Sequence, residues 1–284
     1  MTALANILMD VLYQLRLSGG LMARLKCVLG YYWFYAAGRR RGLSQSESRL
    51  LSLSELARRG ISKRLVKVAY PPGMTMELDA YSASFLLMEF AIECVYTKRA
   101  AFIPRAGWTV VDVGGHQGLF AVDAARRVGP SGRLIAIEAF PGNRLLLEKN
   151  LKANGLSQAV VVAAAAMDFS GEATMYSTEL VSGGQSLVFK EEGRRPLAVR
   201  ADTLDNILAE QDAARPDLVK IDVEGACLIV LKGAAKTLAG KPLLVMEVEG
   251  TPADMDAVRD YVSARGYHTT QEGSVLYAEP GDHS

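Results

Sequence analysis

Residues 110–120, VVDVGGHQGLF, decide the fold of this chain. The valines predict a buried parallel strand, because β-branched residues without polar alternation suit a strand that is covered on both faces. Asp112, Gly114, Gly115 and Gly118 mark the carboxyl end of this strand. The glycines allow a tight turn and the close approach of a ligand, and the helix that follows presents unpaired N–H groups. We therefore predict a ligand site at this strand end.

Strands and helices alternate on the carboxyl side of this stretch. Strands are predicted at 109–113, 133–138, 159–165, 217–223 and 242–248, and helices near 118–128, 142–154, 226–239 and 252–265. Such alternation predicts an α/β fold with a doubly wound, mostly parallel sheet and helices on both faces. Residues 172–200 interrupt it with a predicted hairpin and a Gly/Ser-rich loop, and a loop of this kind often covers a site.

The residues before this sheet differ from it in their hydrophobic pattern. Residues 1–70 lack strand-like runs and carry leucines at helical spacing, YPPGM at 70–74 breaks the chain, and 77–103 are expected to be mostly helical. The sequence therefore predicts a helical N-terminal extension and lid over residues 1–100 and an α/β core over residues 101–284.

Charge and cysteine content restrict the class of protein. The chain has 284 residues and a net charge of +1, but residues 1–70 contain 12 Lys and Arg against 3 Asp and Glu. A basic segment that docks on its own acidic domain explains this asymmetry, and without nucleic-acid motifs we expect no nucleic-acid partner. Three cysteines without ligand spacing indicate a reducing compartment, so a cytoplasmic location is predicted.

An aromatic run, CVLGYYWFYAA, covers residues 27–37. It is too short to cross a bilayer, so neither a membrane span nor a signal peptide is expected. Basic residues flank it, and residues 27–41 could lie on an anionic membrane surface as an interfacial helix. The alternative is a helix that packs its aromatic rings on the core or on a second subunit of a homodimer, and the usual burial of aromatic side chains favours it.

Acidic residues end the first three predicted strands. Asp112 would oppose a pyrophosphate but suits a cationic ligand such as an amino group or a sulfonium. Glu138 can accept two hydrogen bonds from a ribose diol, and Asp168 can accept one from an exocyclic amine. The spacing D-x-G-x-x-x-G differs from the G-x-G-x-x-G of dinucleotide folds, which counts against a nicotinamide-dependent oxidoreductase.

The last two predicted strands carry charged residues at alternate positions. LVKIDVEG contains Lys220, Asp222 and Glu224, and LLVMEVEG contains Glu247 and Glu249. Four carboxylates in one crevice repel one another, so a positive group is needed: Lys220, a bound metal such as Mg²⁺, the cofactor's own cation, or a proton on one acid. A purely structural lysine–carboxylate network is the alternative.

Several motifs in order resemble the FkbM-type S-adenosylmethionine-dependent methyltransferases over about residues 75–279. The motifs are VVDVGGHQG, IAIEAFPGNRLLLEKNLKANG, AAAAMDFSGEATMY, VRADTLDNIL, DLVKIDVEGACLIVLKGAAKTLAG and PLLVMEVEG. The resemblance implies a Rossmann-like class I methyltransferase fold, S-adenosylmethionine as cofactor, and O-methylation of a sugar or secondary metabolite.

The resemblance also implies roles for individual residues. Those matching the family's cofactor site are Asp112, Gly114, Gly115 and Gly118 around the methionine half, Glu138 and the adjacent Ala139 at the ribose, Met167 and Asp168 at the adenine, and Asp222. Asp222 and Glu224 match the acids of its KIDVEG block. Three positions depart from the family: His116 replaces asparagine, Ala139 replaces proline, and Cys227 replaces glutamate.

Methyl transfer to a hydroxyl requires removal of a proton. We rank Asp222 first as its acceptor, then Glu224 and then His116, with Lys220 adjusting their charge; Mg²⁺ could instead lower the pKa of the hydroxyl. Acceptor contacts are expected from Glu93, Tyr96, Gln185 and Ser186. The acceptor could be free or tethered to a carrier. An N-methyltransferase, a nicotinamide-dependent oxidoreductase and a non-catalytic binding module stay open as alternatives.

Overall fold

The computed structural model describes residues 21–42, 65–68, 71, 73–79, 95–177 and 195–281. These residues fall into two compact units. The first contains the described residues up to 79, and the second contains 95–177 and 195–281. Each unit is described by itself below.

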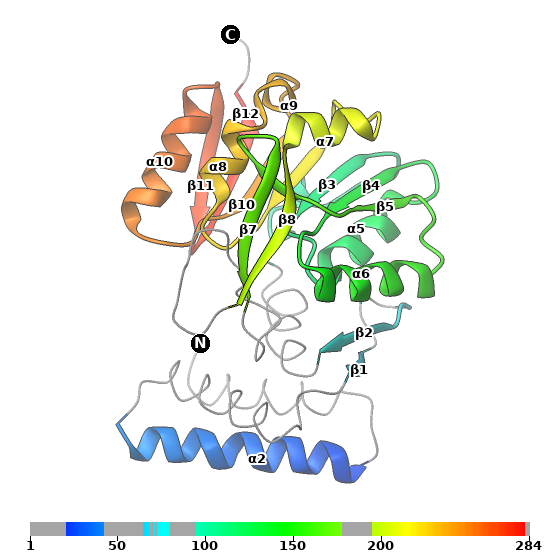
Figure 1. Ribbon diagram of the computed structural model, residues 1–284, viewed down its shortest axis with the longest axis vertical. Helices are drawn as coiled ribbons and strands as arrows, with labels where there is room; N and C mark the ends of the chain where they lie inside the picture. Colours follow the sequence, from blue (N-terminus) through cyan, green and yellow to red (C-terminus); the bar gives the residue numbers. More distant parts are fainter. Residues whose placement is uncertain are drawn as a thin grey trace. The chain divides into compact units, whose positions relative to one another are not determined.

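A seven-stranded sheet forms the centre of the second unit (Figure 1), in the order β11-β12-β10-β9-β3-β4-β5. Its parallel strands are β3 (Thr109–Val113), β4 (Arg133–Ile137), β5 (Ala159–Val162), β9 (Leu218–Ile221) and β10 (Leu243–Glu247). The chain moves outward from β3 to β5 and then returns to the other side of β3, so β3 and β9 flank a topological switch point. The predicted doubly wound, mostly parallel sheet is confirmed.

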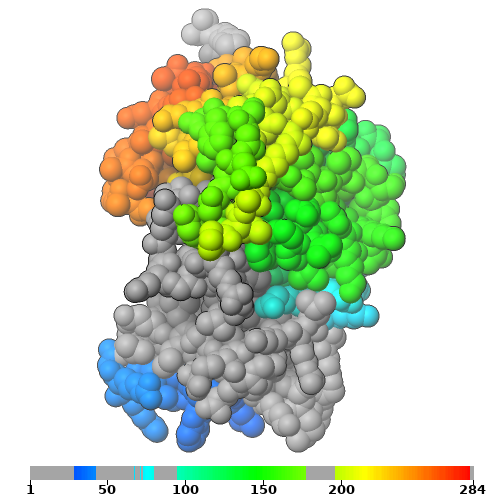
Figure 2. Space-filling view, viewed as in Figure 1, coloured from blue at the N-terminus to red at the C-terminus, as the bar shows by residue number. Residues whose placement is uncertain are grey.

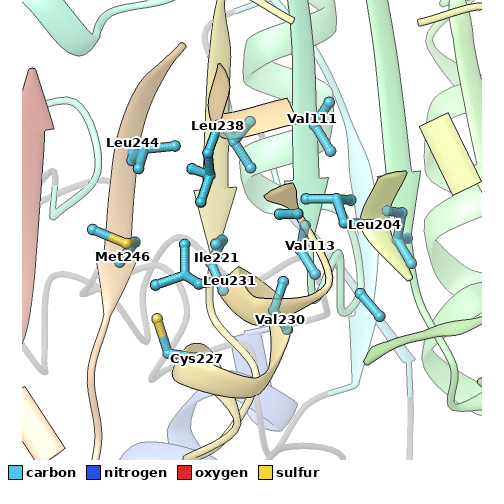
Figure 3. Packing of buried hydrophobic residues seen from close by; sticks show 14 of the residues in the cluster. Val111, Val113, Leu204, Ile221, Cys227, Val230, Leu231, Leu238, Leu244 and Met246 are labelled. Atoms are coloured by element: carbon cyan, nitrogen blue, oxygen red, sulfur yellow. The ribbon is translucent and has the colours of Figure 1, made fainter. Parts of the chain in front are cut away.

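Helices cover both faces of this sheet. They are α5 (Leu119–Val128), α6 (Pro141–Ala153), α7 (Leu204–Glu210), α8 (Cys227–Lys232), α9 (Ala235–Ala239) and α10 (Pro252–Ser263). On one face Val111, Val113 and Ile221 pack against Val230 and Leu231 of α8 (Figure 3). On the other face α5 packs against β3 and β4. Burial on both faces explains the continuous apolar strands in the sequence.

The predicted hairpin is also confirmed, because β7 (Gly171–Ser177) pairs antiparallel with β8 (Arg195–Thr203). β8 also pairs in parallel with β6 (Ala165–Met167), which makes a separate three-stranded sheet. The prediction of one strand over 159–165 is therefore wrong, since β5 ends at Val162 and β6 enters this other sheet. The hairpin forms part of the surface that faces the viewer in Figure 2.

The predicted helix at 226–239 is also divided, into α8 and α9, around Gly233. A Cβ at this glycine would lie 1.9 Å from Met167 O, so the two backbones touch and no side chain fits between them. Three elements were not expected: α7 and the C-terminal hairpin of β11 (Tyr267–Glu272) and β12 (Val275–Pro280), which pairs with β10.

The first unit contains helix α2 (Leu21–Arg40) and a short hairpin of β1 (Leu65–Val68) and β2 (Met76–Asp79). The aromatic run is helical, but the helical prediction for residues 1–70 and the mostly helical one for 77–103 are wrong at the hairpin. Trp33 and Leu29, one turn apart on α2, are 72% and 66% exposed. No helix in the described part of the chain has the length and apolarity to span a membrane. Membrane contact by residues 27–41 and a homodimer stay predictions.

Candidate active site

The glycine turn after β3 lies at the switch point, against the end of β9. Gly114 has a φ of 81°, and a Cβ there would lie 1.8 Å from Asp222 O. At Gly118, φ is 94° and a Cβ would lie 2.7 Å from Leu147 Cδ1 on α6. Both positions therefore require glycine, for the left-handed backbone and for space. The close approach of this turn to Asp222 brings VVDVGGHQG, the first motif, against DLVKIDVEGACLIVLKGAAKTLAG, the fifth.

Glu138 connects the end of β4 to this turn. Its carboxylate accepts hydrogen bonds from His116 N at 2.8 Å and Phe140 N at 2.7 Å. The side chain is 7% exposed, and burial raises its pKa to about 7, although the two backbone donors act in the opposite direction. Each oxygen retains a second lone pair, so the residue can still receive hydroxyl donors. Ala139 beside it is buried.

A buried lysine joins the acids of β3 and β9. Lys220 Nζ lies 3.0 Å from Asp112 Oδ1 and 3.4 Å from Asp222 Oδ2, and it donates to Gly114 O at 2.8 Å. Burial alone would lower the pKa of Lys220, but Asp112 and Asp222 outweigh it and raise that pKa, so the ammonium stays charged. Lys220 is therefore a positive centre and not a proton acceptor.

Asp112 is fully buried, and burial raises its pKa despite the charge of Lys220. Its Oδ2 has no hydrogen-bond partner within the described ranges. A buried carboxylate oxygen without a partner is costly, and a cationic or N–H donor ligand would relieve that cost. This observation fits the cationic ligand predicted for the position.

Tyr96 bridges the ends of β9 and β10. Its hydroxyl lies 3.0 Å from Asp222 Oδ2 and 2.6 Å from Glu247 Oε2. Ser274 Oγ donates to the other oxygen of Glu247 at 3.0 Å. Burial, and then the charge of Asp222, raise the pKa of Glu247. Sequence reasoning missed Ser274 and this bridge, because no local pattern links positions so far apart.

Glu224 and Glu249 form a second carboxyl pair. Burial is the largest of the effects that raise the pKa of Glu249 to about 8. The charge of Glu224 and a hydrogen bond to it also raise this pKa, and the charges of Asp222 and Glu247 raise it by smaller amounts. The predicted crowding of four carboxylates is thus confirmed. The expected strand alternation is wrong here, because β9 ends at Ile221 and Glu224 has a φ of 48° in the following turn.

Other predicted residues occupy different environments. Met167 is 8% exposed, Asp168 is exposed, and His116, half-buried in the glycine turn, has a φ of 48°. Burial raises the pKa of the Cys227 thiol to about 12, so this thiol stays neutral. The expected acceptor contacts Glu93, Gln185 and Ser186 lie outside the described residues.

Two polar residues that the sequence analysis did not single out hold the glycine turn. Gln117 and Asn150 are fully buried, and Asn150 Nδ2 of α6 donates to Gln117 O at 2.9 Å. An asparagine on the buried face of an amphipathic helix is a signal that could have revealed this contact.

A metal has no support in the described ranges. They contain no group of three or more His, Cys, Asp or Glu side chains placed to hold an ion. The positive charge that the carboxylates need is supplied in part by Lys220.

The switch-point site and its acids define an α/β protein that binds a nucleoside cofactor at the strand ends. The sequence model of the Methyltransferase FkbM domain matches residues 112–269. The chain belongs to the FkbM methyltransferase family and is an S-adenosylmethionine-dependent methyltransferase. The family implies S-adenosylmethionine as methyl donor and a methyl acceptor as substrate. No curated protein matches the sequence.

Solved methyltransferase structures are similar in part. Methyltransferase FkbM from Methylobacillus flagellatus KT is 16% identical with a TM-score of 0.49, covering 87% of this chain and 70% of that one. An S-adenosylmethionine-dependent O-methyltransferase from Thermotoga maritima is 14% identical with a TM-score of 0.38, covering 75% and 69%. Fibrillarin from Aeropyrum pernix, in complex with S-adenosyl-L-methionine, is 13% identical with a TM-score of 0.40, covering 61% and 67%.

Proposed function

We propose that this methyltransferase transfers the methyl group to a hydroxyl of a small molecule, a secondary metabolite or a sugar, and that Asp222 removes the hydroxyl proton. The observation that carries the proposal is the position of Asp222. It lies at the switch point against Gly114, paired with the buried ammonium of Lys220, and its side chain is 30% exposed. It combines access with a fixed ion-pair partner.

The cofactor would be held by the glycine turn and the acids of β3 and β4. The turn of Gly114, Gly115 and Gly118 would border it, and Glu138 offers lone pairs for a ribose diol. Asp112 offers a buried oxygen that has no hydrogen-bond partner among the described residues. Met167 and Asp168, from their match to the family, and Ala139, from its place beside Glu138, are proposed to border the adenine and ribose. When bound, S-adenosylmethionine supplies an electrophilic methyl group on a sulfonium.

The protein's own task is to orient the hydroxyl and accept its proton. Lys220 cannot accept it, because its ammonium stays charged. Glu224 is the second candidate, although its pairing with Glu249 favours a shared proton at this position. His116 is the third. Its backbone N–H donates to Glu138, so the residue also helps to hold the glycine turn.

The first test is calorimetric titration with S-adenosylhomocysteine. Wild type should bind one equivalent with micromolar affinity, and Asp112→Ala and Glu138→Ala should each weaken binding at least tenfold. Absence of binding to folded wild type would contradict the cofactor assignment of these residues.

The second test separates the proton acceptor from the cofactor site. Asp222→Asn should lose methyl transfer by about 100-fold or more, the scale of general-base catalysis. This loss should exceed any loss of S-adenosylhomocysteine affinity, which is measured in parallel because Asp222 also matches the family's cofactor site. Asp217→Asn, at the opposite end of β9, is the matched control and should keep both properties. Acceptors would be screened as free and carrier-tethered hydroxyl compounds, with amines in parallel. Turnover of amines alone would overturn O-methylation.

A further inference from the structure

We propose that Tyr96 is a positioning residue of this site, whose hydroxyl holds the carboxylate of Asp222 and links it to Glu247. The inference rests on the proposed role of Asp222. Tyr96 lies 126 residues before Asp222 and 151 before Glu247 in the chain, and its hydroxyl reaches both. It therefore fixes two neighbouring strand ends relative to each other. This role differs from the acceptor contact expected from the sequence.

The ring of Tyr96 is held rigidly. The residue is 1% exposed, packs edge to face on Phe120 with ring centroids 6.0 Å apart, and has Lys220 Nζ 5.2 Å from its ring centroid. A side chain enclosed in this way cannot turn its hydroxyl toward another partner without repacking the core. The direction of the hydrogen bonds to the carboxylates is thus set by packing.

Tyr96 and Lys220 both contact the same oxygen of Asp222. The hydroxyl is 3.0 Å and the ammonium 3.4 Å from Oδ2. In the described part of the chain Oδ1 has no hydrogen bond or ion pair. We infer that the two contacts orient the carboxylate and leave Oδ1 to receive the proton of the acceptor hydroxyl. The O–H bond of the acceptor breaks as an O–H bond at Asp222 forms. The acceptor oxygen forms a bond to the methyl carbon while the carbon–sulfur bond of the sulfonium breaks, and its electron pair stays on the sulfur of the S-adenosylhomocysteine that leaves.

One phenolic proton cannot satisfy two carboxylates at once. The hydroxyl donates either to Asp222 or to Glu247, so the ionisation of one acid depends on that of the other. The other charged groups around this pair are Lys220 with Asp112 on β9 and β3, and Glu224 and Glu249 beyond β9 and β10. Ser274, before β12, adds a neutral donor to Glu247.

Removal of the hydroxyl tests this link without any need for the acceptor. In Tyr96→Phe the ring contacts remain, and the pH midpoint of Glu247 should rise by about one unit, because a donor that favours the ionised form is lost. The midpoint is measured by ¹³C NMR of the side-chain carboxyl carbons and assigned with Glu247→Gln. S-adenosylhomocysteine affinity should stay within twofold.

Tyr277→Phe is the matched control. Tyr277 is also 1% exposed, and its hydroxyl donates to Val95 O, one residue before Tyr96. This variant should lose a buried hydrogen bond but leave the Glu247 midpoint unchanged. Equal midpoints in wild type and Tyr96→Phe, or equal shifts in the two Phe variants, would overturn the proposal.

Two further variants keep the test decisive if Tyr96→Phe fails to fold. Asp222→Asn should lower the Glu247 midpoint more than Glu249→Gln, because the Tyr96 hydroxyl contacts Asp222 and Glu247. Equal shifts would reject the link. Methyl transfer by Asp222→Asn separates the two proposals. Retained turnover removes the role of Asp222, whereas lost turnover together with an unshifted Glu247 midpoint in Tyr96→Phe removes only the role of Tyr96.

Discussion

At the ends of β3 and β4, Asp112 and Glu138 are almost inaccessible, whereas at the ends of β9 and β10, Asp222 and Glu247 are partly exposed. Backbone N–H groups satisfy Glu138, and Lys220 compensates Asp112. The acids on the other side are held by side chains, those of Tyr96, Ser274 and Lys220. One sheet edge thus holds two kinds of acid site.

Under the proposed function, this difference separates cofactor binding from proton transfer. Backbone donors and buried charges are preorganised, so β3 and β4 can bind a ligand with little rearrangement. Hydroxyl and carboxyl groups exchange protons with their neighbours, so β9 and β10 suit a step in which a proton moves. Variants at the ends of β3 and β4 should therefore change ligand binding, whereas variants at the ends of β9 and β10 should change proton transfer.

The largest effect is expected at Gly114. In Gly114→Ala the new Cβ would collide with Asp222 O and occupy a φ of 81°, so the two sides would be forced apart. We expect loss of S-adenosylhomocysteine binding and destabilisation by about 3 kcal/mol or more. The measurements are urea unfolding and calorimetry.

Gly129→Ala is the control for that prediction. Gly129 also has a positive φ of 67°, but a Cβ there meets nothing within 4 Å. Gly129→Ala should lower the free energy of unfolding by about 1 kcal/mol and leave S-adenosylhomocysteine binding unchanged. If the two substitutions lowered stability equally, the close contact between Gly114 and Asp222 O would contribute nothing to the effect at position 114.

Lys220 joins the two sides, and its loss should be nearly as severe. Lys220→Met leaves Asp112 buried without its counter-charge, which typically costs about 3–5 kcal/mol. Urea unfolding near neutral pH measures the effect. The double variant Asp112→Asn/Lys220→Met should recover part of the lost stability, and no recovery would argue against a direct pairing.

Glu138 should give the binding side a pH dependence of stability. Its pKa is 4.5 in the ordinary case and about 7 here, so the folded state holds more protons than the unfolded state between these values. The free energy of unfolding should therefore fall as pH rises from about 4.5 through about 7, by on the order of 3 kcal/mol for a fully buried group.

The Glu138→Gln variant should remove this dependence. Unfolding is measured in urea at intervals between pH 5 and pH 8, with Glu148→Gln on α6 as the exposed control. Parallel curves for wild type and Glu138→Gln would contradict the raised pKa of this carboxyl.

The smallest effect is expected for Glu249. Burial, and then the charge of Glu224, raise its pKa from 4.5 to about 8, so the free energy of unfolding should fall as pH rises from about 4.5 through about 8. Because both groups are partly exposed, Glu249→Gln should be more stable than wild type by no more than about 1 kcal/mol at pH 9, by less at pH 6, and not at all at pH 4. Urea unfolding at the three pH values tests this, and an equal difference at pH 4 and pH 9 would contradict it.

The sequence predicted the parts of the site that adjoin a strand end. Asp112, Glu138 and Asp222 each end an apolar run, and parallel strands bring their carboxyl ends to one edge. Strand boundaries were less accurate beyond β5 and β9, where the chain enters another sheet or a turn. The short hairpin of β1 and β2 was missed, because four-residue strands carry little periodicity of their own.

The sequence by itself determined the alternating α/β architecture, the glycine turn and the acids around it, because these depend on local patterns of burial and backbone freedom. Which side chains form ion pairs, and which carboxylates contact one hydroxyl, depends on how the elements pack in the folded chain. Lys220 pairs with Asp112 through the register of β3 and β9, and Tyr96 reaches Asp222 and Glu247 from a distant segment. Such contacts arise from packing between elements, so the residue pattern within one element cannot predict them.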